Sequence, residues 1–304
     1  MPETPLYIGL DAGGTKTEAL ARTSQQADPT RLSGPAANLQ RQGVEATARV
    51  LATLIEQALA QHPDARLHAV CAGVAGAGSP DDQHTLATHV RSLLGDEAPA
   101  LVQITHDGAI ALEAAFEGGS GVIVIAGTGS ILFARTRRGE VLRAGGWGYL
   151  LGDEGSGHVL GIHGLRAVAH AFEGGPPTRL HTLLAERHGL ATPDALKRSV
   201  YRENWPVQQM ARLVIEAAEQ GDAEAQRIIA EQTGALAQQV TWLAGQTVEV
   251  EPRLALLGGL TQSAFYKEAL ADALLGALPG WRVREPLHPP VVGALRMAMT
   301  RISS

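Results

Sequence analysis

Two turns rich in glycine and threonine follow runs of strand-forming residues, far apart in the chain. The first is DAGGTKT at residues 11–17, after an apolar run at 6–10. The second is AGTGS at residues 126–130, after an apolar run at 122–125. The backbone N–H groups of such a turn, together with a threonine hydroxyl, are suited to binding phosphate. A strand, a turn and a returning strand, used twice, predict two related lobes.

The first turn differs from the common phosphate loops, because those lead directly into a helix whose N-terminus holds the phosphate. Here a second strand-like run follows, so we expect a hairpin whose turn binds phosphates. Gly13 and Gly14 allow the backbone to approach closely, Thr15 adds a hydroxyl and Lys16 adds charge. Asp11, at the end of the strand, is suited to hold hydrated Mg²⁺. An ordinary glycine hairpin is the alternative interpretation.

Asp107 stands between a predicted short strand at 101–105 and a predicted helix at 108–116. Ligands gather at the carboxyl ends of strands in α/β folds. A carboxylate there could act as a general base that takes a proton from an attacking hydroxyl during phosphoryl transfer. The alternative is a helix N-cap, a position where aspartate is common.

The stretch GGWGYLLGDEGSG at residues 145–157 is dense in glycine and precedes a predicted helix. Its carboxylates, Asp153 and Glu154, could accept hydrogen bonds from sugar hydroxyls while Trp147 meets the flat face of a sugar ring. Glycines at this density indicate close approach of a ligand or special backbone dihedrals. The alternative is a capping cluster formed by Asp153, Glu154 and Ser156, with Trp147 in the core.

Two further positions carry weaker signals. Asn38 lies in the loop at 34–38, where an isolated asparagine is usually a turn residue. Gly258 and Gly259 end a predicted strand and precede a helix. They could serve strand-to-helix packing, or they could form a backbone surface on which adenine lies.

The composition narrows the function classes. The 304 residues suffice for one large domain or two of ordinary size, and 45% hydrophobic and 18% charged residues are typical of a globular chain. The net charge of −6 argues against nucleic acid or an anionic membrane as a partner. A single cysteine, Cys71, excludes an intrachain disulfide and a cysteine-only metal site. With no signal peptide pattern and no apolar run of about 18 residues, we expect a cytoplasmic protein.

Strands alternate with helices along the chain, which predicts an α/β layer fold. The glycine cluster at 118–121 is the best domain boundary, and the strand–turn–strand pattern begins again after it. We expect a structured loop at 142–156 and mostly helical structure over 180–248. The remaining predicted strands are 6–10, 17–22, 67–75 and 254–257, and the remaining predicted helices are 44–62, 84–94, 157–172, 264–276 and 291–302.

These segments, in this order, resemble the actin-like sugar-kinase superfamily. They are most similar to its N-acetylglucosamine kinase branch and to the related BadF/BadG/BcrA/BcrD-type ATPase family. The strongest parts of the match are IGLDAGGTKT, THDGAIAL, IAGTGS, GGWGYLLGDEGS and LLGGL. The resemblance implies an α/β fold of two RNase H-like lobes with the active site in an interlobe cleft. It implies lobes at 1–117 and 118–289, the second with a helical insertion, and a C-terminal helix at 290–304 packed back on the first lobe.

The resemblance also implies roles for residues that match the family motifs. Asp107 would be the catalytic base and Asp11 would lie near Mg²⁺. The region around Ala217 and Ala218 would lie near the nucleotide. The residues expected to bind ATP and its metal are Asp11, Gly13, Gly14, Thr15, Lys16, Thr128, Gly129, Gly258, Gly259 and Ser263. The residues expected to bind the sugar are Asn38, Asp107, Thr128, Gly146, Trp147 and Asp153.

The implied activity is transfer of a phosphoryl group from ATP, with Mg²⁺, to a hydroxyl of N-acetylglucosamine or glucosamine, O6 being the expected position. The implied assembly is a homodimer. One alternative is a kinase for a muramic-type sugar. Another is an ATPase that acts as a regulatory or activator protein, although Cys71 alone cannot supply the paired cysteines of the iron–sulfur activators. A non-catalytic sugar sensor is disfavoured because both Asp11 and Asp107 are present.

Overall fold

The computed structural model describes residues 4–246 and 249–300, and the chain divides into two compact units. Unit 1 comprises the residues up to Gly119 together with the segment from Pro286 onward. Unit 2 runs Ser120–Glu285. Within the described ranges, no helix is both long and apolar enough to cross a bilayer.

Unit 1 contains a five-stranded sheet in the order β3-β2-β1-β4-β5. The central strand β1 pairs antiparallel with β2, which pairs antiparallel with β3, whereas β1, β4 and β5 run parallel. The strands are β1 (Thr4–Ala12), β2 (Lys16–Thr23), β3 (Thr30–Pro35), β4 (Ala65–Val74) and β5 (Leu101–His106).

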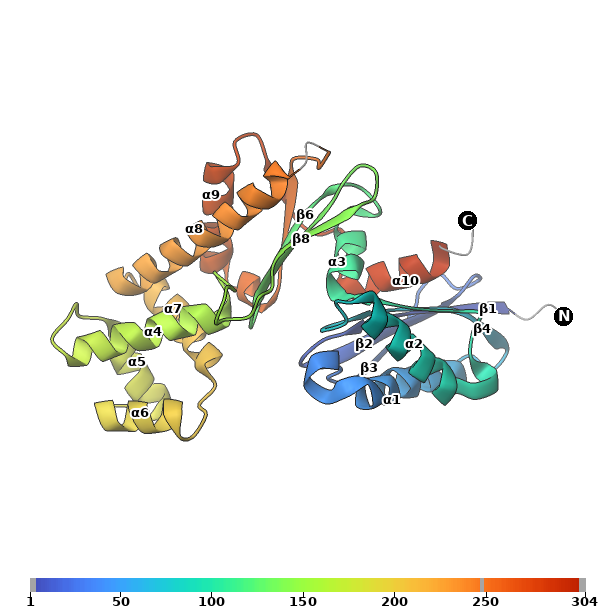
Figure 1. Cartoon of the computed structure of the whole chain (residues 1–304), viewed down its shortest axis with the longest axis horizontal. Helices are drawn as coiled ribbons and strands as arrows, with labels where there is room; N and C mark the ends of the chain where they lie inside the picture. Colours follow the sequence, from blue (N-terminus) through green and yellow to red (C-terminus); the bar gives the residue numbers. More distant parts are fainter. Residues whose placement is uncertain (1–3, 247–248, 301–304) are drawn as a thin grey trace. The chain divides into compact units, whose positions relative to one another are not determined.

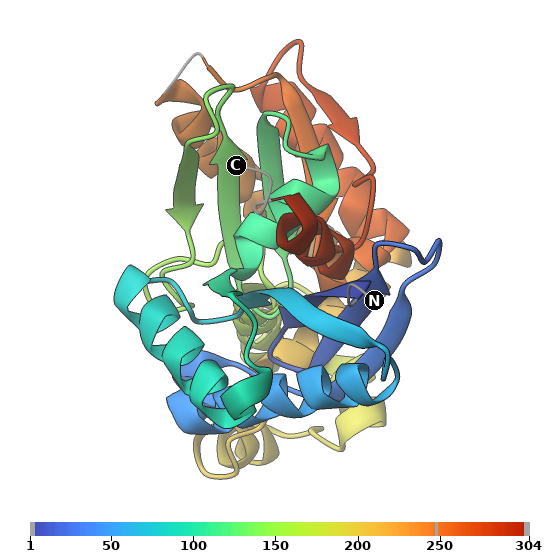
Figure 2. The ribbon, with the colours of Figure 1, turned by 90° about the vertical axis from the view of Figure 1, so that its right-hand side faces the viewer.

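Helices cover both faces of this sheet because side chains of a strand alternate between faces. On β1, Leu6, Ile8 and Leu10 are fully buried in the cluster that also contains α1 and α2 (Figure 1). Helix α10 packs on the opposite face, where a Cβ on Gly9 would lie 2.1 Å from the backbone nitrogen of Leu295. Figure 2 shows the same two layers from the side. The helices are α1 (Leu39–Ala60), α2 (Pro80–Leu94), α3 (Asp107–Phe116) and α10 (Pro290–Thr300), with a 3-10 turn at Gly95–Glu97.

Unit 2 repeats this topology. Its sheet has the order β10-β9-β6-β7-β8, with β6, β7 and β8 antiparallel to one another and with β6, β9 and β10 parallel. The strands are β6 (Gly121–Ala126), β7 (Ser130–Arg135), β8 (Val141–Gly145), β9 (Arg253–Leu257) and β10 (Arg282–Arg284). Each unit therefore begins with a hairpin whose first strand then pairs with a parallel strand, as the doubled turn predicts.

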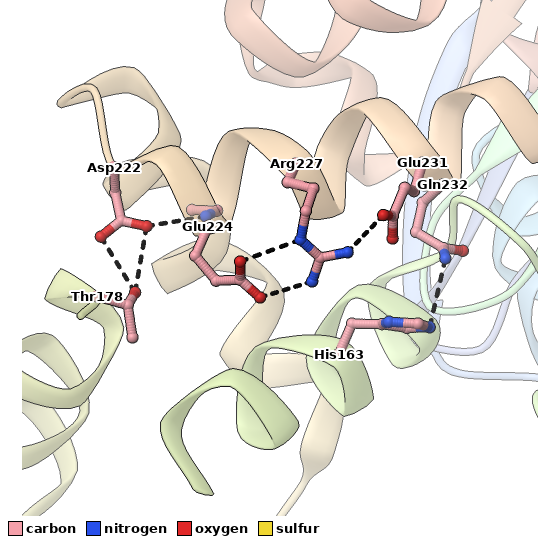
Figure 3. A network of polar contacts seen from close by, with 8 residues as sticks. His163, Thr178, Asp222, Glu224, Arg227, Glu231 and Gln232 are labelled. Atoms are coloured by element: carbon pink, nitrogen blue, oxygen red, sulfur yellow. Dashed lines mark hydrogen bonds and ion pairs between the residues drawn. The ribbon is translucent and has the colours of Figure 1, made fainter. Parts of the chain in front are cut away.

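The helices of unit 2 lie between β8 and β9 and after β9 (Figure 1). Asp222 joins the starts of two of them. Its carboxylate accepts hydrogen bonds from the hydroxyl of Thr178, the N-cap of α5 (Figure 3). It also accepts from the backbone nitrogens of Arg179 on α5 and Ala225 on α8. The helices are α4 (Gly157–Phe172), α5 (Arg179–His188), α6 (Pro193–Tyr201), α7 (Met210–Glu219), α8 (Ala223–Gly245) and α9 (Ala264–Ala277), with 3-10 turns at Val207–Gln209 and Gly259–Gln262.

Most of the predicted elements are confirmed, and one prediction needs correction. Residues 142–145 belong to β8 and not to a loop, because they pair with β7. The edge strands β3 and β10 have no predicted counterpart. Residues 247–248 of the predicted helical stretch, and 301–302 of the final helix, lie outside the described residues.

Candidate functional site

In unit 1 the predicted site residues gather at one edge of the sheet. Because β1, β4 and β5 are parallel, their carboxyl ends meet at this edge, with Ala12 beside Val74 and Val74 beside His106. We call this the carboxyl edge of unit 1. The glycine turn follows β1 there, and α3 begins there after β5.

The glycine turn is a tight hairpin closed by a hydrogen bond from the backbone nitrogen of Gly13 to the carbonyl of Lys16, at 3.1 Å. Neither Gly13 nor Gly14 has a positive φ, and a Cβ on Gly14 would meet nothing nearer than Arg41 Nη1, at 4.0 Å. The fold therefore does not require glycine at position 14. Thr15 is exposed on the same turn. The open backbone fits the predicted approach of a phosphate.

Asp11 and Asp107 share this edge and influence each other. The pKa of Asp11 is raised from its usual 3.8 to about 6, first by burial and then by the negative charges of Asp107 and Glu18, while Lys16 opposes the shift. Lys16 itself is exposed, and its ammonium lies 3.3 Å from the Glu18 carboxylate. The net negative charge of the carboxylates at this edge favours binding of a cation.

Asp107 is the first residue of α3 and not its N-cap, so that alternative is wrong. The N-cap is His106, whose ring nitrogen Nδ1 accepts a hydrogen bond from the backbone nitrogen of Ala109 at 3.1 Å. Asp107 Oδ1 accepts from the backbone nitrogen of Gly108 at 2.9 Å. Among the described residues Oδ2 has no hydrogen-bond partner, which leaves one carboxylate oxygen available to a ligand.

Asn38 lies at the same edge, in a bridge with Ala75 just beyond β4. Its Oδ1 caps α1 by accepting from the backbone nitrogen of Arg41, at 3.1 Å. The interpretation as a local turn residue therefore accounts for this oxygen, whereas the amide nitrogen has no partner in the described part of the chain. Arg41, which lies beside Gly14, was not predicted as a site residue. Its position three residues after Asn38 is the one sequence signal that could have indicated it.

In unit 2 the second glycine turn contacts the start of α4. The backbone nitrogen of Gly157 donates to the carbonyl of Gly127 at 2.7 Å, and that of His158 donates to the carbonyl of Thr128 at 3.1 Å. The Thr128 side chain is exposed. A Cβ on Gly129 would lie 2.7 Å from Asp153 Oδ2, so this glycine is required by the close approach of the carboxylate.

Asp153 is buried, with 8% of its surface exposed, and has a φ of 64°. Burial raises its pKa, while hydrogen bonds from the backbone N–H groups of Gly148 and Ser130 act in the opposite direction. Of the three residues in the capping-cluster interpretation, Asp153, Glu154 and Ser156, it is Ser156 that caps α4. Asp153 instead ties the loop after β8 to the second glycine turn.

The loop between Gly146 and Asp153 presents apolar side chains to solvent. Trp147 is 72% exposed, so its alternative interpretation as a core residue is wrong. Gly146 has a φ of 69° and its backbone nitrogen donates to the carbonyl of Ser130 at 3.0 Å. Tyr149 stacks on His158 with ring centroids 3.8 Å apart. Trp147 is therefore available to a ligand next to Asp153.

The third group of unit 2 follows β9. Gly258 has a φ of 102°, and a Cβ there would lie 2.2 Å from the carbonyl oxygen of Ala126, so packing alone requires this glycine. A Cβ on Gly259 would meet nothing within 4 Å. Ser263 caps α9 and its hydroxyl donates to Glu219 at the end of α7, at 3.2 Å. The open surface at Gly259 fits the predicted nucleotide contact.

Ala217 and Ala218, expected near the nucleotide, are fully buried on α7. Their side chains are therefore not available to a ligand, whereas Glu219, next to them, is exposed and bonded to Ser263.

No group of three or more His, Cys, Asp or Glu side chains arranged for a metal ion occurs in residues 4–246 and 249–300.

Comparison with known proteins agrees with this geometry. The sequence model of the BadF/BadG/BcrA/BcrD ATPase family matches residues 8–298 of this chain. The chain is 32% identical to the N-acetylmuramic acid/N-acetylglucosamine kinase of Clostridium acetobutylicum, over 74% of both chains. It is 26% identical to the N-acetyl-D-glucosamine kinase of Dictyostelium discoideum, over 97% of this chain and 98% of the other.

A solved structure of a candidate N-acetylglucosamine kinase from Chromobacterium violaceum superposes with a TM-score of 0.76 and 26% identity, covering 98% of this chain and all of the other. The two-lobed actin-like fold expected from the sequence is thus confirmed, as is the enzyme class of kinase. The chain belongs to the BadF/BadG/BcrA/BcrD ATPase family.

Proposed function

We propose that this protein is an ATP-dependent amino-sugar kinase that phosphorylates a hydroxyl, O6, of N-acetylglucosamine or glucosamine. The observation that carries the proposal is the pair Asp11 and Asp107, two electrostatically coupled carboxylates at the carboxyl edge of unit 1. The names of the related kinases support an amino sugar as the acceptor.

Each unit carries open backbone and hydroxyl groups that are suited to a nucleotide. The turn at Gly13, Gly14 and Thr15 offers N–H groups and a hydroxyl to the phosphates, and Lys16 adds positive charge. The corresponding groups of unit 2 are Thr128, Gly129, Gly258, Gly259 and Ser263.

Asp107 is the proposed general base. Its Oδ1 is occupied by the backbone nitrogen of Gly108, which fixes the carboxylate, and Oδ2 is the oxygen that takes the proton of the attacking hydroxyl. A base with this role typically contributes a rate factor of about 10² to 10⁴. Most of the remaining acceleration in phosphoryl transfer comes from positioning and electrostatic stabilisation.

The residues at this edge fit Mg²⁺, which takes one or two carboxylates together with substrate phosphates. Asp11 is the proposed ligand, because its carboxylate is largely buried beside the negative charges of Asp107 and Glu18, which together raise its pKa although Lys16 opposes the shift. When bound, Mg²⁺ would neutralise charge on the phosphates.

The sugar is bound by polar groups and one aromatic surface. In unit 1 the amide of Asn38 and the carboxylate of Asp107 are suited to sugar hydroxyls. In unit 2 the carboxylate of Asp153 is suited to them as well, and Gly146 belongs to the loop that carries Trp147. Thr128 is the proposed hydroxyl contact. The exposed indole of Trp147 offers a flat apolar face to the ring.

A muramic-type sugar is a second candidate acceptor, because one relative is named for both N-acetylmuramic acid and N-acetylglucosamine. The two differ by a lactyl group on the sugar. A panel of N-acetylglucosamine, glucosamine and N-acetylmuramic acid, with ATP and Mg²⁺, separates them by ADP release. Locating the phosphate on the product by ³¹P–¹H NMR tests whether O6 is the phosphorylated position.

ADP release that does not depend on any sugar would instead support a regulatory or activator ATPase. Light scattering tests the proposed homodimer.

The decisive variant is Asp107→Ala. We expect kcat to fall by about 10² to 10⁴, the range typical of a lost general base, with ATP affinity largely retained. Asp81→Ala is a matched control, because Asp81 is an exposed carboxylate in the first turn of α2 in the same unit. Unchanged turnover of Asp107→Ala would refute the assignment.

A further inference from the structure

Both backbone polar groups of Gly155 are bonded to side chains that lie far away in the sequence. Its N–H donates to Gln232 Oε1 on α8 at 3.3 Å. Its carbonyl accepts from the Tyr266 hydroxyl on α9 at 2.5 Å. Gly155 is buried, so these two side chains satisfy groups that water cannot reach. The turn formed by residues 153–156, which carries Asp153, is thus held from two helices.

Both the backbone conformation and the packing at this point favour glycine. Gly155 has a φ of 75°, and a Cβ there would lie 2.8 Å from Leu236 Cδ2 and 3.1 Å from the Tyr266 hydroxyl. Helices α8 and α9 therefore press directly against the turn. Glu154, the preceding residue, is also hydrogen-bonded to α8, through the amide of Gln239.

The two side chains that hold Gly155 are themselves fixed. Gln232 is 7% exposed, and its amide nitrogen lies 3.3 Å from the ring nitrogen Nε2 of His163 on α4 (Figure 3). Tyr266 is fully buried, and burial raises the pKa of its phenol, so the hydroxyl stays protonated and donates. Neither side chain is among the residues predicted to bind a ligand.

We propose that Tyr266 and Gln232 are positioning residues for sugar binding: they hold the turn at 153–156 so that Asp153 stands in the orientation that accepts sugar hydroxyls. This inference rests on the proposed amino-sugar kinase activity. Because Asp153 also contacts the second glycine turn, movement of Gly155 would change how the carboxylate lies against Gly129.

Tyr266→Phe tests the proposal, because it removes one hydroxyl and keeps the ring in the core. The buried carbonyl of Gly155 then loses its partner. We expect the KM for N-acetylglucosamine to rise about tenfold and the KM for ATP to change less than twofold. In hydrogen–deuterium exchange, amides of residues 150–157 should exchange faster than in the parent protein. Gln232→Met, which removes the other partner of Gly155, should have the same two effects.

Thr233→Val is the matched control. Thr233 is 1% exposed and lies next to Gln232 on α8. Among the described residues, its hydroxyl bonds only to carbonyls of α8. Both Thr233→Val and Tyr266→Phe remove a buried hydroxyl, so a general loss of stability should appear in both variants. The sugar KM and the amide exchange at 150–157 should change only in the variants in which Gly155 loses a partner.

Tyr266→Phe with an unaltered sugar KM and unaltered exchange at 150–157 would overturn the proposal. If the parent protein phosphorylates no amino sugar, the proposed function fails. The inference about sugar binding then fails as well. Hydrogen–deuterium exchange still decides whether Tyr266 holds the turn at 153–156.

Discussion

Asp11→Asn should stabilise the protein at neutral pH while impairing catalysis. The substitution keeps the size of the side chain and removes a charge that burial and the neighbouring Asp107 both disfavour. Because no hydrogen bond of the Asp11 carboxylate occurs in the described part of the chain, the variant loses little else. A residue kept at a cost to stability is expected where function needs it.

The magnitude follows from the pKa. In the unfolded chain Asp11 titrates near 3.8, and in the folded protein near 6. Between these values the folded state binds a proton that the unfolded state has lost, so the contribution of Asp11 to the free energy of unfolding falls as pH rises. At about 1.36 kcal/mol per pH unit, the full cost above pH 6 is about 3 kcal/mol. Asp11→Asn should therefore match the parent near pH 4 and exceed it by up to that amount at pH 7.5.

Urea unfolding at several pH values between 4 and 8, without nucleotide or metal, measures this difference. Asp28→Asn, at an exposed position of unit 1, is the control and should follow the parent at every pH. Addition of Mg²⁺ and ATP should stabilise the parent more than Asp11→Asn. A stability difference that does not grow between pH 4 and 7.5 would refute the reasoning about Asp11.

Two further variants test unit 2. Trp147→Ala should leave stability unchanged, because the side chain is 72% exposed, and should raise the sugar KM about three- to tenfold through loss of an aromatic contact. The control is Trp242→Ala, at another exposed tryptophan, which should change neither stability nor the sugar KM. Equal sugar KM values for the two variants would contradict the role of Trp147. Gly258→Ala should destabilise unit 2 by about 3 kcal/mol or more in urea unfolding, because its φ of 102° and the carbonyl of Ala126 leave no place for a Cβ. Gly259→Ala, where a Cβ meets nothing within 4 Å, should unfold like the parent.

The order of strands and helices was readable from the sequence because it depends on local patterns. The apolar run at 6–10 and the helical spacing of apolar residues in 44–62 are set by neighbours a few residues apart. Edge strand β3 was missed because its pattern of half-buried and exposed residues carries no strong apolar signal. Strand β8 was missed because its final residue, Gly145, merges into the glycine-rich loop that follows.

The candidate site was only partly predictable. The glycine turns and Asp107 were recognised because motifs mark them, but local sequence did not reveal which residue caps α3. His106 takes that position, and Asp107 keeps an oxygen available. Likewise, Trp147 could be core or surface from its type alone, and only the fold places it in solvent.

The sequence by itself determined the two strand–turn–strand units, the family and the residues of the glycine turns, since these are properties of contiguous segments. Only the tertiary structure decided the charge environment of Asp11 and the hydrogen bonds that hold Gly155. Asp11 acquires its raised pKa from burial and from a carboxylate that reaches the same edge through β5. Gly155 is bonded to a tyrosine 111 residues away, and such a contact exists only once separate helices have packed together.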